Sequence, residues 1–116
     1  MSRILVLDTS ASVKLDASGN GTAQAGPGLP GVSWQPETVA VSAAPPVSSE
    51  AQCNVYLGLS AQAGSLLGAT STGSTGDSTD VHGQTVWPGQ FLIAVWTGGD
   101  PGATATMSIF GQKQVP

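Results

Sequence analysis

The stretch Phe91-Leu92-Ile93-Ala94-Val95-Trp96 is the best candidate for the core of this 116-residue chain. All six residues are apolar, which is typical of a strand that is buried on both faces. Such a strand lies at the centre of a sandwich or is covered by a partner subunit. We expect Phe91, Ile93 and Val95 in the core, and we expect Val95→Asp to prevent folding because it would bury an unpaired charge.

Four further stretches alternate apolar and polar residues, as strands do when one face is buried and the other meets water. These stretches cover residues 13–15, 39–43, 53–57 and 103–109. Their apolar faces complete the predicted core with Val55, Leu57, Met107 and Ile109.

Turn residues separate these strands. Ser18-Gly19-Asn20-Gly21 predicts a hairpin that joins residues 13–15 to residues 22–25, because Gly and Asn accept positive φ. Residues 26–31 contain two prolines, which cannot donate to a ladder, and they predict a crossing between sheets.

Other turn signals lie further along the chain. Pro45-Pro46 is expected to end the strand at 39–43, and Trp87-Pro88-Gly89-Gln90 to introduce the apolar strand. Residues 97–102 are expected to connect that strand to the final one. The polar stretch from Gly68 to Gly83 predicts a long exposed loop, with room for one short edge strand.

Gly or Pro interrupts nearly every stretch on which a helix could form. The sequence therefore predicts an all-β fold with little or no helix, namely a single antiparallel β-sandwich that is jelly-roll-like or Ig-like. We expect one domain over residues 1–116, with its core at about 4–112 and the long polar loop at about 68–83.

Charged residues make up 9% of the chain, against about 25% in soluble proteins, and the net charge is −4. Three cationic residues, Arg3, Lys14 and Lys113, cannot neutralise a row of phosphates, so we expect no nucleic acid partner. No apolar run reaches the roughly 20 residues of a membrane span, and we expect no membrane insertion. Because an isolated monomer usually exposes more charge, we expect other chains to cover much of the surface.

Candidates for catalysis or metal binding are few. His82 is the one histidine, without a nucleophile at a fixed spacing, and we expect no enzyme and no cofactor. Asp77 and Asp80 are weak candidates for calcium, which prefers carboxylate and carbonyl oxygens in loops, and Asx turns explain them as well. Cys53 lies in an alternating apolar run and is expected to be a buried, inert thiol.

Trp34, Tyr56, Trp87 and Trp96 offer flat rings on which a sugar could stack. Aromatic residues in a small β domain also serve as core or interface anchors. The candidates for an interface or a glycan site are Trp34, Trp87 and His82.

Several turn-rich motifs carry a family resemblance. They are Leu7-Asp8-Thr9-Ser10, the stretch from Leu15 to Thr22, Gly26-Pro27, Cys53-Asn54-Val55-Tyr56-Leu57-Gly58, residues 73–80 and residues 94–103. In these motifs the chain resembles small β-sandwich virion structural proteins of tailed phages that infect actinobacteria. The resemblance implies a non-enzymatic structural role on the tail, its tip or the capsid surface, and it carries over no catalytic residue.

Two hypotheses of function follow. The first is a structural virion protein, such as a minor tail, tail-tip or capsid-decoration component. It would be made in the cytoplasm of the bacterial host and act through oligomerisation, for example as a trimer, and through contacts with other virion proteins. The alternative is a carbohydrate-binding adhesin module that attaches to a host-surface glycan through Trp34 or Trp87 and the polar loop.

Overall fold

The computed structural model describes residues 3–44 and 48–116. Pro45-Pro46, expected to end a strand, lies outside the described residues. The described chain forms eight strands and one short 3₁₀ turn, η1 (Ala63–Ser65). The strands are β1 (Arg3–Lys14), β2 (Gly21–Ala25), β3 (Ser33–Ala44), β4 (Gln52–Gly58), β5 (Leu66–Thr70), β6 (Asp77–Asp80), β7 (Phe91–Thr97) and β8 (Thr104–Val115).

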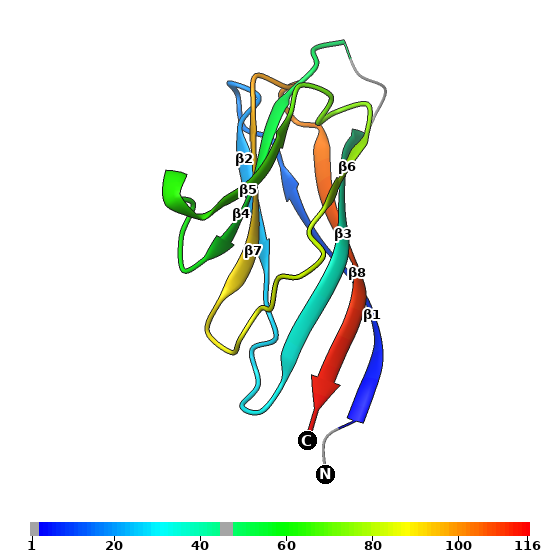
Figure 1. Cartoon of the computed structure of the whole chain (residues 1–116). Coiled ribbons are helices and arrows are strands. Elements are labelled where there is room, and N and C mark those ends of the chain that lie inside the picture. The colour runs from blue at the N-terminus through cyan, green and yellow to red at the C-terminus, as the bar shows by residue number, and fades with distance from the viewer. Residues whose placement is uncertain (1–2, 45–47) are drawn as a thin grey trace.

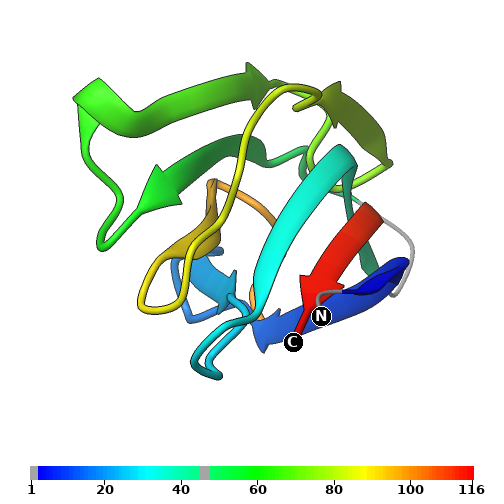
Figure 2. The ribbon, with the colours of Figure 1, turned by 60° about the horizontal axis from the view of Figure 1, so that its bottom comes forward.

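The strands form two antiparallel sheets that pack face to face (Figures 1 and 2). The first sheet has the order β1-β8-β3-β6 and the second the order β2-β7-β4-β5. This arrangement of eight strands is a jelly roll, whereas an Ig-like sandwich keeps its first two strands in one sheet. The predicted all-β sandwich is confirmed, and the strand order selects the jelly roll. None of the helical segments in the described residues is long and apolar enough to cross a membrane.

The core lies between the two sheets. Val55, Met107 and Ile109 are buried there, as predicted, and Leu57 is partly buried against them. Burial raises the pKa of the Cys53 thiol to about 12, so this thiol stays protonated and unreactive in the folded chain. Other members of the core are Leu7, Leu15, Ala23, Val39, Val41, Leu92, Ala94, Trp96 and Ala105.

The strand β7 is central in the second sheet, between β2 and β4. Leu92, Ala94 and Trp96 face the core, and each is 0% exposed. Phe91 and Val95 lie on the opposite face of β7, where they are half-buried. The prediction that Phe91 and Val95 belong to the core is therefore wrong, because a run that is apolar on both faces gives no alternation by which to choose the inner one.

Ile93 is buried, as predicted, but on the outer face of the second sheet. Its exposed fraction is 2%, and it does not belong to the cluster between the sheets. The register places it between Gln24 of β2 and Tyr56 of β4. Such cross-strand neighbours lie close enough to cover a side chain from both sides.

The turn at Ser18-Gly19-Asn20-Gly21 forms but does not make a hairpin. β1 pairs with β8 in the first sheet and β2 pairs with β7 in the second, so the turn carries the chain across the sandwich. The Gly99 N–H donates to the Gly19 carbonyl at 2.9 Å, and a Cβ on Gly19 would lie 1.9 Å from the Gly99 carbonyl oxygen. The predicted hairpin is wrong because turn residues fix local φ and ψ without choosing the partner strand.

The other predicted connections agree with the structure. Residues 26–31 lead from β2 in the second sheet to β3 in the first. The Gln90 N–H donates to the Trp87 carbonyl in the turn that introduces β7. Residues 97–102 lead from β7 back to β8 in the first sheet.

The stretch 68–83 is more ordered than a long exposed loop. It contains the end of β5 and all of β6, which are edge strands of opposite sheets. Between them Ser74 is 2% exposed, and its hydroxyl accepts the Ala51 N–H while its carbonyl accepts the Ala43 N–H. The short edge strand is confirmed. The prediction of an exposed loop is wrong at Ser74, which is buried and hydrogen-bonded to Ala43 and Ala51. The sequence does not indicate these bonds, because the residues that they join are far apart along the chain.

Two carboxylates tie together the connections at one end of the sandwich. Glu50 accepts the N–H groups of Ser74 and Thr75 at 3.0 and 2.9 Å, and also the Thr75 hydroxyl. Asp100 accepts the hydroxyl and the N–H of Ser48 at 2.7 and 2.8 Å. The Thr75 hydroxyl lowers the pKa of Glu50, and the Ser48 hydroxyl lowers the pKa of Asp100.

Stability is expected to fall in acid as these carboxylates take up protons. A carboxyl group with a lowered pKa stabilises the fold above its ordinary pKa, 4.5 for Glu50 and 3.8 for Asp100. That contribution is lost as the pH falls toward the lower folded value. We expect a level melting temperature from neutral pH to about pH 5 and a decline below about pH 4, measured by circular dichroism.

The control is the double variant Glu50→Gln, Asp100→Asn, which cannot titrate at these two positions. Its melting temperature should be lower than that of the unsubstituted protein at neutral pH and should change less in acid. An acid dependence equal to that of the unsubstituted protein would contradict the role given to Glu50 and Asp100.

Candidate functional site

The first sheet has an outer face that points away from the second sheet. Alternate residues of β1, β8 and β3 lie on this face, and near the two termini the register forms two rows of cross-strand neighbours (Figure 1). The rows are Ile4, Gln114 and Ser33, followed by Val6, Gln112 and Gln35. We call the surface formed by these six residues the glutamine face.

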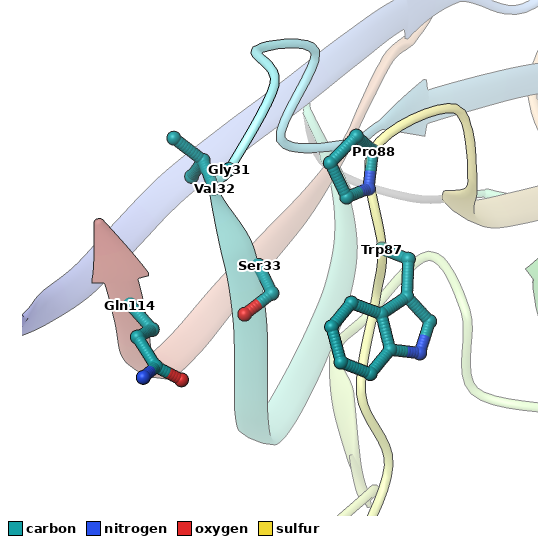
Figure 3. A pocket seen from close by; sticks show the side chains of 6 residues that line it. All are labelled: Gly31, Val32, Ser33, Trp87, Pro88 and Gln114. Carbon is teal, nitrogen blue, oxygen red and sulfur yellow. The ribbon is translucent and has the colours of Figure 1, made fainter. Parts of the chain in front are cut away.

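The chain beyond β6 extends this face. Trp34 and Val86 form an antiparallel bridge, in which each backbone N–H donates to the other carbonyl at 2.9 and 2.8 Å. One residue along, Trp87 lies beside Ser33 (Figure 3). Trp34 is buried in the core at 8% exposure, so the prediction that it contributes to an interface or glycan site is wrong. Its backbone holds the segment that carries Trp87 instead.

A hollow of about 350 Å³ lies between Trp87 and the glutamine face. The indole of Trp87 and the ring of Pro88 lie on one side, Gln114 lies on the other, and Ser33 lies between them (Figure 3). The lining residues are Gly31, Val32, Ser33, Trp87, Pro88 and Gln114. None of these six carries a charge, so the hollow combines an exposed aromatic ring with neutral polar groups.

A second hollow of about 200 Å³ continues along the same three segments of chain. It is lined by residues 35–37 of β3, by Gln112 of β8 and by residues 82–85 after β6. His82, a predicted interface or glycan residue, lines this second hollow together with Glu37. The structure therefore places Trp87 and His82 in consecutive hollows of one surface.

Of the four rings proposed as a sugar platform, Trp87 alone is open to a ligand. Its side chain is 58% exposed, whereas Trp34 and Trp96 are buried. Tyr56 lies on the outer face of the second sheet, where its hydroxyl accepts the Asn54 side-chain amide at 3.1 Å. The expectation of a shared aromatic platform is wrong, because the strands place these rings on different faces.

Asp77 and Asp80 are not brought together. They are three residues apart on β6, so their side chains lie on opposite faces of the strand. Asp77 accepts the Thr70 hydroxyl at 2.5 Å, which lowers the pKa of Asp77, and Asp80 accepts the His82 N–H at 2.9 Å. Within residues 3–44 and 48–116, no group of three His, Cys, Asp or Glu side chains is placed to hold a metal ion.

The glutamine face itself was not predicted from the sequence. The sequence feature that could have indicated this face is the spacing of two between Gln112 and Gln114 near the C-terminus and between Ile4 and Val6 near the N-terminus. The register that sets these residues side by side joins the first strand to the last, and no local pattern gives that register.

Comparisons with protein-family models, with curated proteins and with solved structures each returned no match for this chain. The function proposed below therefore depends on the residues, on their geometry and on the motifs described above.

Proposed function

We propose that the chain is a non-enzymatic structural protein of a virion, of the kind its motifs resemble. It assembles with copies of itself and docks on other virion proteins. The observation that carries the proposal is an exposed apolar edge of the first sheet. On β1, Ile4, Leu5 and Val6 are 66%, 42% and 79% exposed, and Phe110 of β8 is 43% exposed. Ile4, Val6 and Phe110 share the outer face of the sheet.

The strand β1 is a long and weakly protected edge. It extends over 12 residues from Arg3 to Lys14, and among the described strands it pairs with β8 alone. Every second backbone N–H and C=O along β1 therefore points away from β8, where a further strand can bind. Monomeric proteins protect such edges with charges, prolines or bulges, but β1 has three charged residues, no proline and a continuous register with β8.

The outer residues of β8, which is an inner strand of this sheet, support the same proposal because none of them is charged. They are Thr104, Thr106, Ser108, Phe110, Gln112 and Gln114. Away from the two termini the outer face carries hydroxyl groups, and Ser12 and Thr106 form a hydrogen bond of 3.0 Å across β1 and β8. Hydroxyl and amide groups are less costly to remove from water than charged groups, and the centres of protein interfaces are depleted in charge. A surface of this kind can be covered by another chain at a modest desolvation cost.

Two modes of self-association use this edge. Pairing of β1 with the β1 strand of a second copy closes as a two-fold dimer. If β1 instead contacts a different surface of the next copy, successive copies can form a closed ring. The smallest such ring is a trimer.

Native mass spectrometry with particle analysis tests the proposal. The unsubstituted protein should give the mass of an oligomer, and Val6→Lys should give the monomer because the contact would have to desolvate an ammonium group. Val6 is 79% exposed in the single chain, so the substitution should leave the fold stable. Leu59→Lys is the matched control, since Leu59 is 77% exposed and lies outside β1. This substitution should leave the oligomer intact.

The virion assignment needs its own measurement. Protein mass spectrometry of purified particles should find the chain among the structural components. A monomeric mass for the unsubstituted protein at micromolar concentration, together with absence of the chain from particles, would contradict the proposal.

A further inference from the structure

We infer that the hollow beside Trp87 binds a neutral saccharide, a function separate from the assembly proposed above. The exposed indole of Trp87 offers a flat apolar surface, and Ser33 and Gln114 offer hydroxyl and amide groups beside it (Figure 3). A sugar ring has the matching chemistry, because it presents C–H groups on a face and hydroxyl groups around its rim. Sites for small ligands generally combine an apolar wall with a few placed polar groups.

The backbone holds Trp87 in place. Its N–H donates to the Gln90 side-chain oxygen at 3.1 Å, and its carbonyl accepts the Gln90 N–H at 3.0 Å. The bridge between Trp34 and Val86 fixes the backbone before Trp87. After Trp87, the ring of Pro88 restricts the φ angle of Pro88 itself. Because the backbone is already fixed, binding of a ligand has to order only the side chain of Trp87 and not the segment that carries it.

The polar groups of the hollow suit the hydroxyl groups of a sugar. Ser33 is 6% exposed and lines the hollow, so its hydroxyl can meet a ligand only from within the hollow. The hydroxyl oxygen accepts a hydrogen bond from the Gln35 side-chain amide at 3.2 Å, which leaves the Ser33 O–H to donate. A glutamine amide such as that of Gln114 carries both donors and an acceptor on one plane. Neighbouring hydroxyl groups of a sugar can use both kinds of partner.

The charge of the site favours a neutral ligand over an anionic one. None of the six lining residues is charged, and the chain has a net charge of −4. An acidic sugar would give up hydration of its carboxylate without gaining a cationic partner. The volume of about 350 Å³ lies at the low end of the roughly 300–1,000 Å³ of small-molecule sites, which suits a sugar ring better than a large cofactor.

The second hollow indicates where further units of a bound saccharide would lie. It follows the first along β3 and β8 and is lined by Gln35 and Gln112, whose amides repeat the chemistry of Gln114. A saccharide of two or more units can therefore stack its first ring on Trp87 and extend past Gln35 and Gln112 toward His82.

Amide NMR titration of the full chain tests the inference. The probes are methyl glycosides of glucose, galactose, mannose and N-acetylglucosamine, their neutral disaccharides, glucuronic acid as the anionic comparison and phenol as an aromatic comparison. We expect at least one neutral saccharide to shift the signals of Ser33, Gln114 and the Trp87 indole. Disaccharides should bind more tightly than single rings, and glucuronic acid more weakly.

Three variants separate stacking from a general effect on the surface. Trp87→Ala should weaken binding at least about tenfold, while Trp87→Phe, which keeps a ring, should recover part of the loss. Phe110→Ala removes an exposed ring of the same sheet that lines neither hollow, and it should leave binding unchanged. Leu59→Lys, which lies outside both hollows, should also bind normally. Assembly is measured from the native mass and saccharide binding from the amide shifts, so failure of assembly and failure of saccharide binding remain distinguishable.

Three results would overturn the inference. They are no shift with any saccharide at about 10 mM, binding of phenol without any saccharide, and unchanged saccharide affinity in a folded Trp87→Ala protein.

Discussion

Leu92→Asp is expected to leave the protein unfolded, whereas Val95→Asp is expected to fold. Leu92 is 0% exposed between the two sheets, and a carboxylate there would have no cationic partner. Val95 lies on the outer face of the same strand and is half-buried. Its cross-strand neighbours are Thr22 and Asn54, whose hydroxyl and amide groups can donate to a carboxylate.

The two substitutions differ in size of effect for this reason. Small domains are stable by roughly 5–15 kcal/mol, and the cost of burying the Leu92→Asp carboxylate should remove most or all of that stability. The loss of stability in Val95→Asp should be about 1–2 kcal/mol. Labelling of Cys53 with a thiol reagent reports the difference, because this thiol is 0% exposed in the folded chain. We expect fast labelling in Leu92→Asp and protection in Val95→Asp. The reverse result would show that β7 presents the opposite face to the core.

Trp96→Ala is expected to destabilise the fold by about 3–5 kcal/mol. The Trp96 side chain is 0% exposed, so its removal leaves a cavity between the sheets. Its indole N–H also donates to the Gly73 carbonyl at 3.0 Å, and that carbonyl would lose its partner. Gly73 packs closely against the core, since a Cβ on Gly73 would lie 2.6 Å from Cys53 Cβ. The Trp96 indole therefore helps to hold the connection between β5 and β6, together with the hydrogen bonds of Ser74 to Ala43, Glu50 and Ala51.

Urea denaturation monitored by circular dichroism measures the Trp96 effect. Trp96→Phe is the companion variant, because it keeps most of the ring volume but not the N–H donor. Its loss should be smaller, at about 1–3 kcal/mol. Equal losses for the two variants would mean that the cavity contributes little, and a loss under about 1 kcal/mol for Trp96→Ala would contradict the packing described for this corner.

Alternation along the chain was sufficient to predict β4 and parts of β3 and β8, at residues 39–43 and 103–109, because these parts bury one face and expose the other. It missed residues 33–38 of β3 and residues 110–115 of β8. It could not orient β7, whose faces are both apolar. The pairing of β7 with β4 decides its orientation, since directly opposite residues of an antiparallel pair share a face. The opposed pairs are Cys53 with Trp96, Val55 with Ala94, and Leu57 with Leu92.

The candidate site was predictable only in part, for a related reason. Trp87 stands in a Pro-Gly turn, and its exposure agrees with that setting. Trp34 also follows a turn-rich stretch, but its side chain packs in the core with Val86 and other residues that are distant in sequence. The glutamine face likewise depends on the register of the first strand against the last. Long-range pairing, which local patterns do not contain, assembles the site.

The proposed assembly covers β1 and the uncharged outer residues of β8 with neighbouring chains in a virion. Cryo-electron microscopy of the particle locates the chain and its neighbours. We expect repeated copies of an eight-stranded jelly roll in the map, with Ile4 and Val6 of β1 in contact with an adjacent chain. A map without this jelly roll, or one in which β1 faces solvent in every copy, would contradict the proposed assembly.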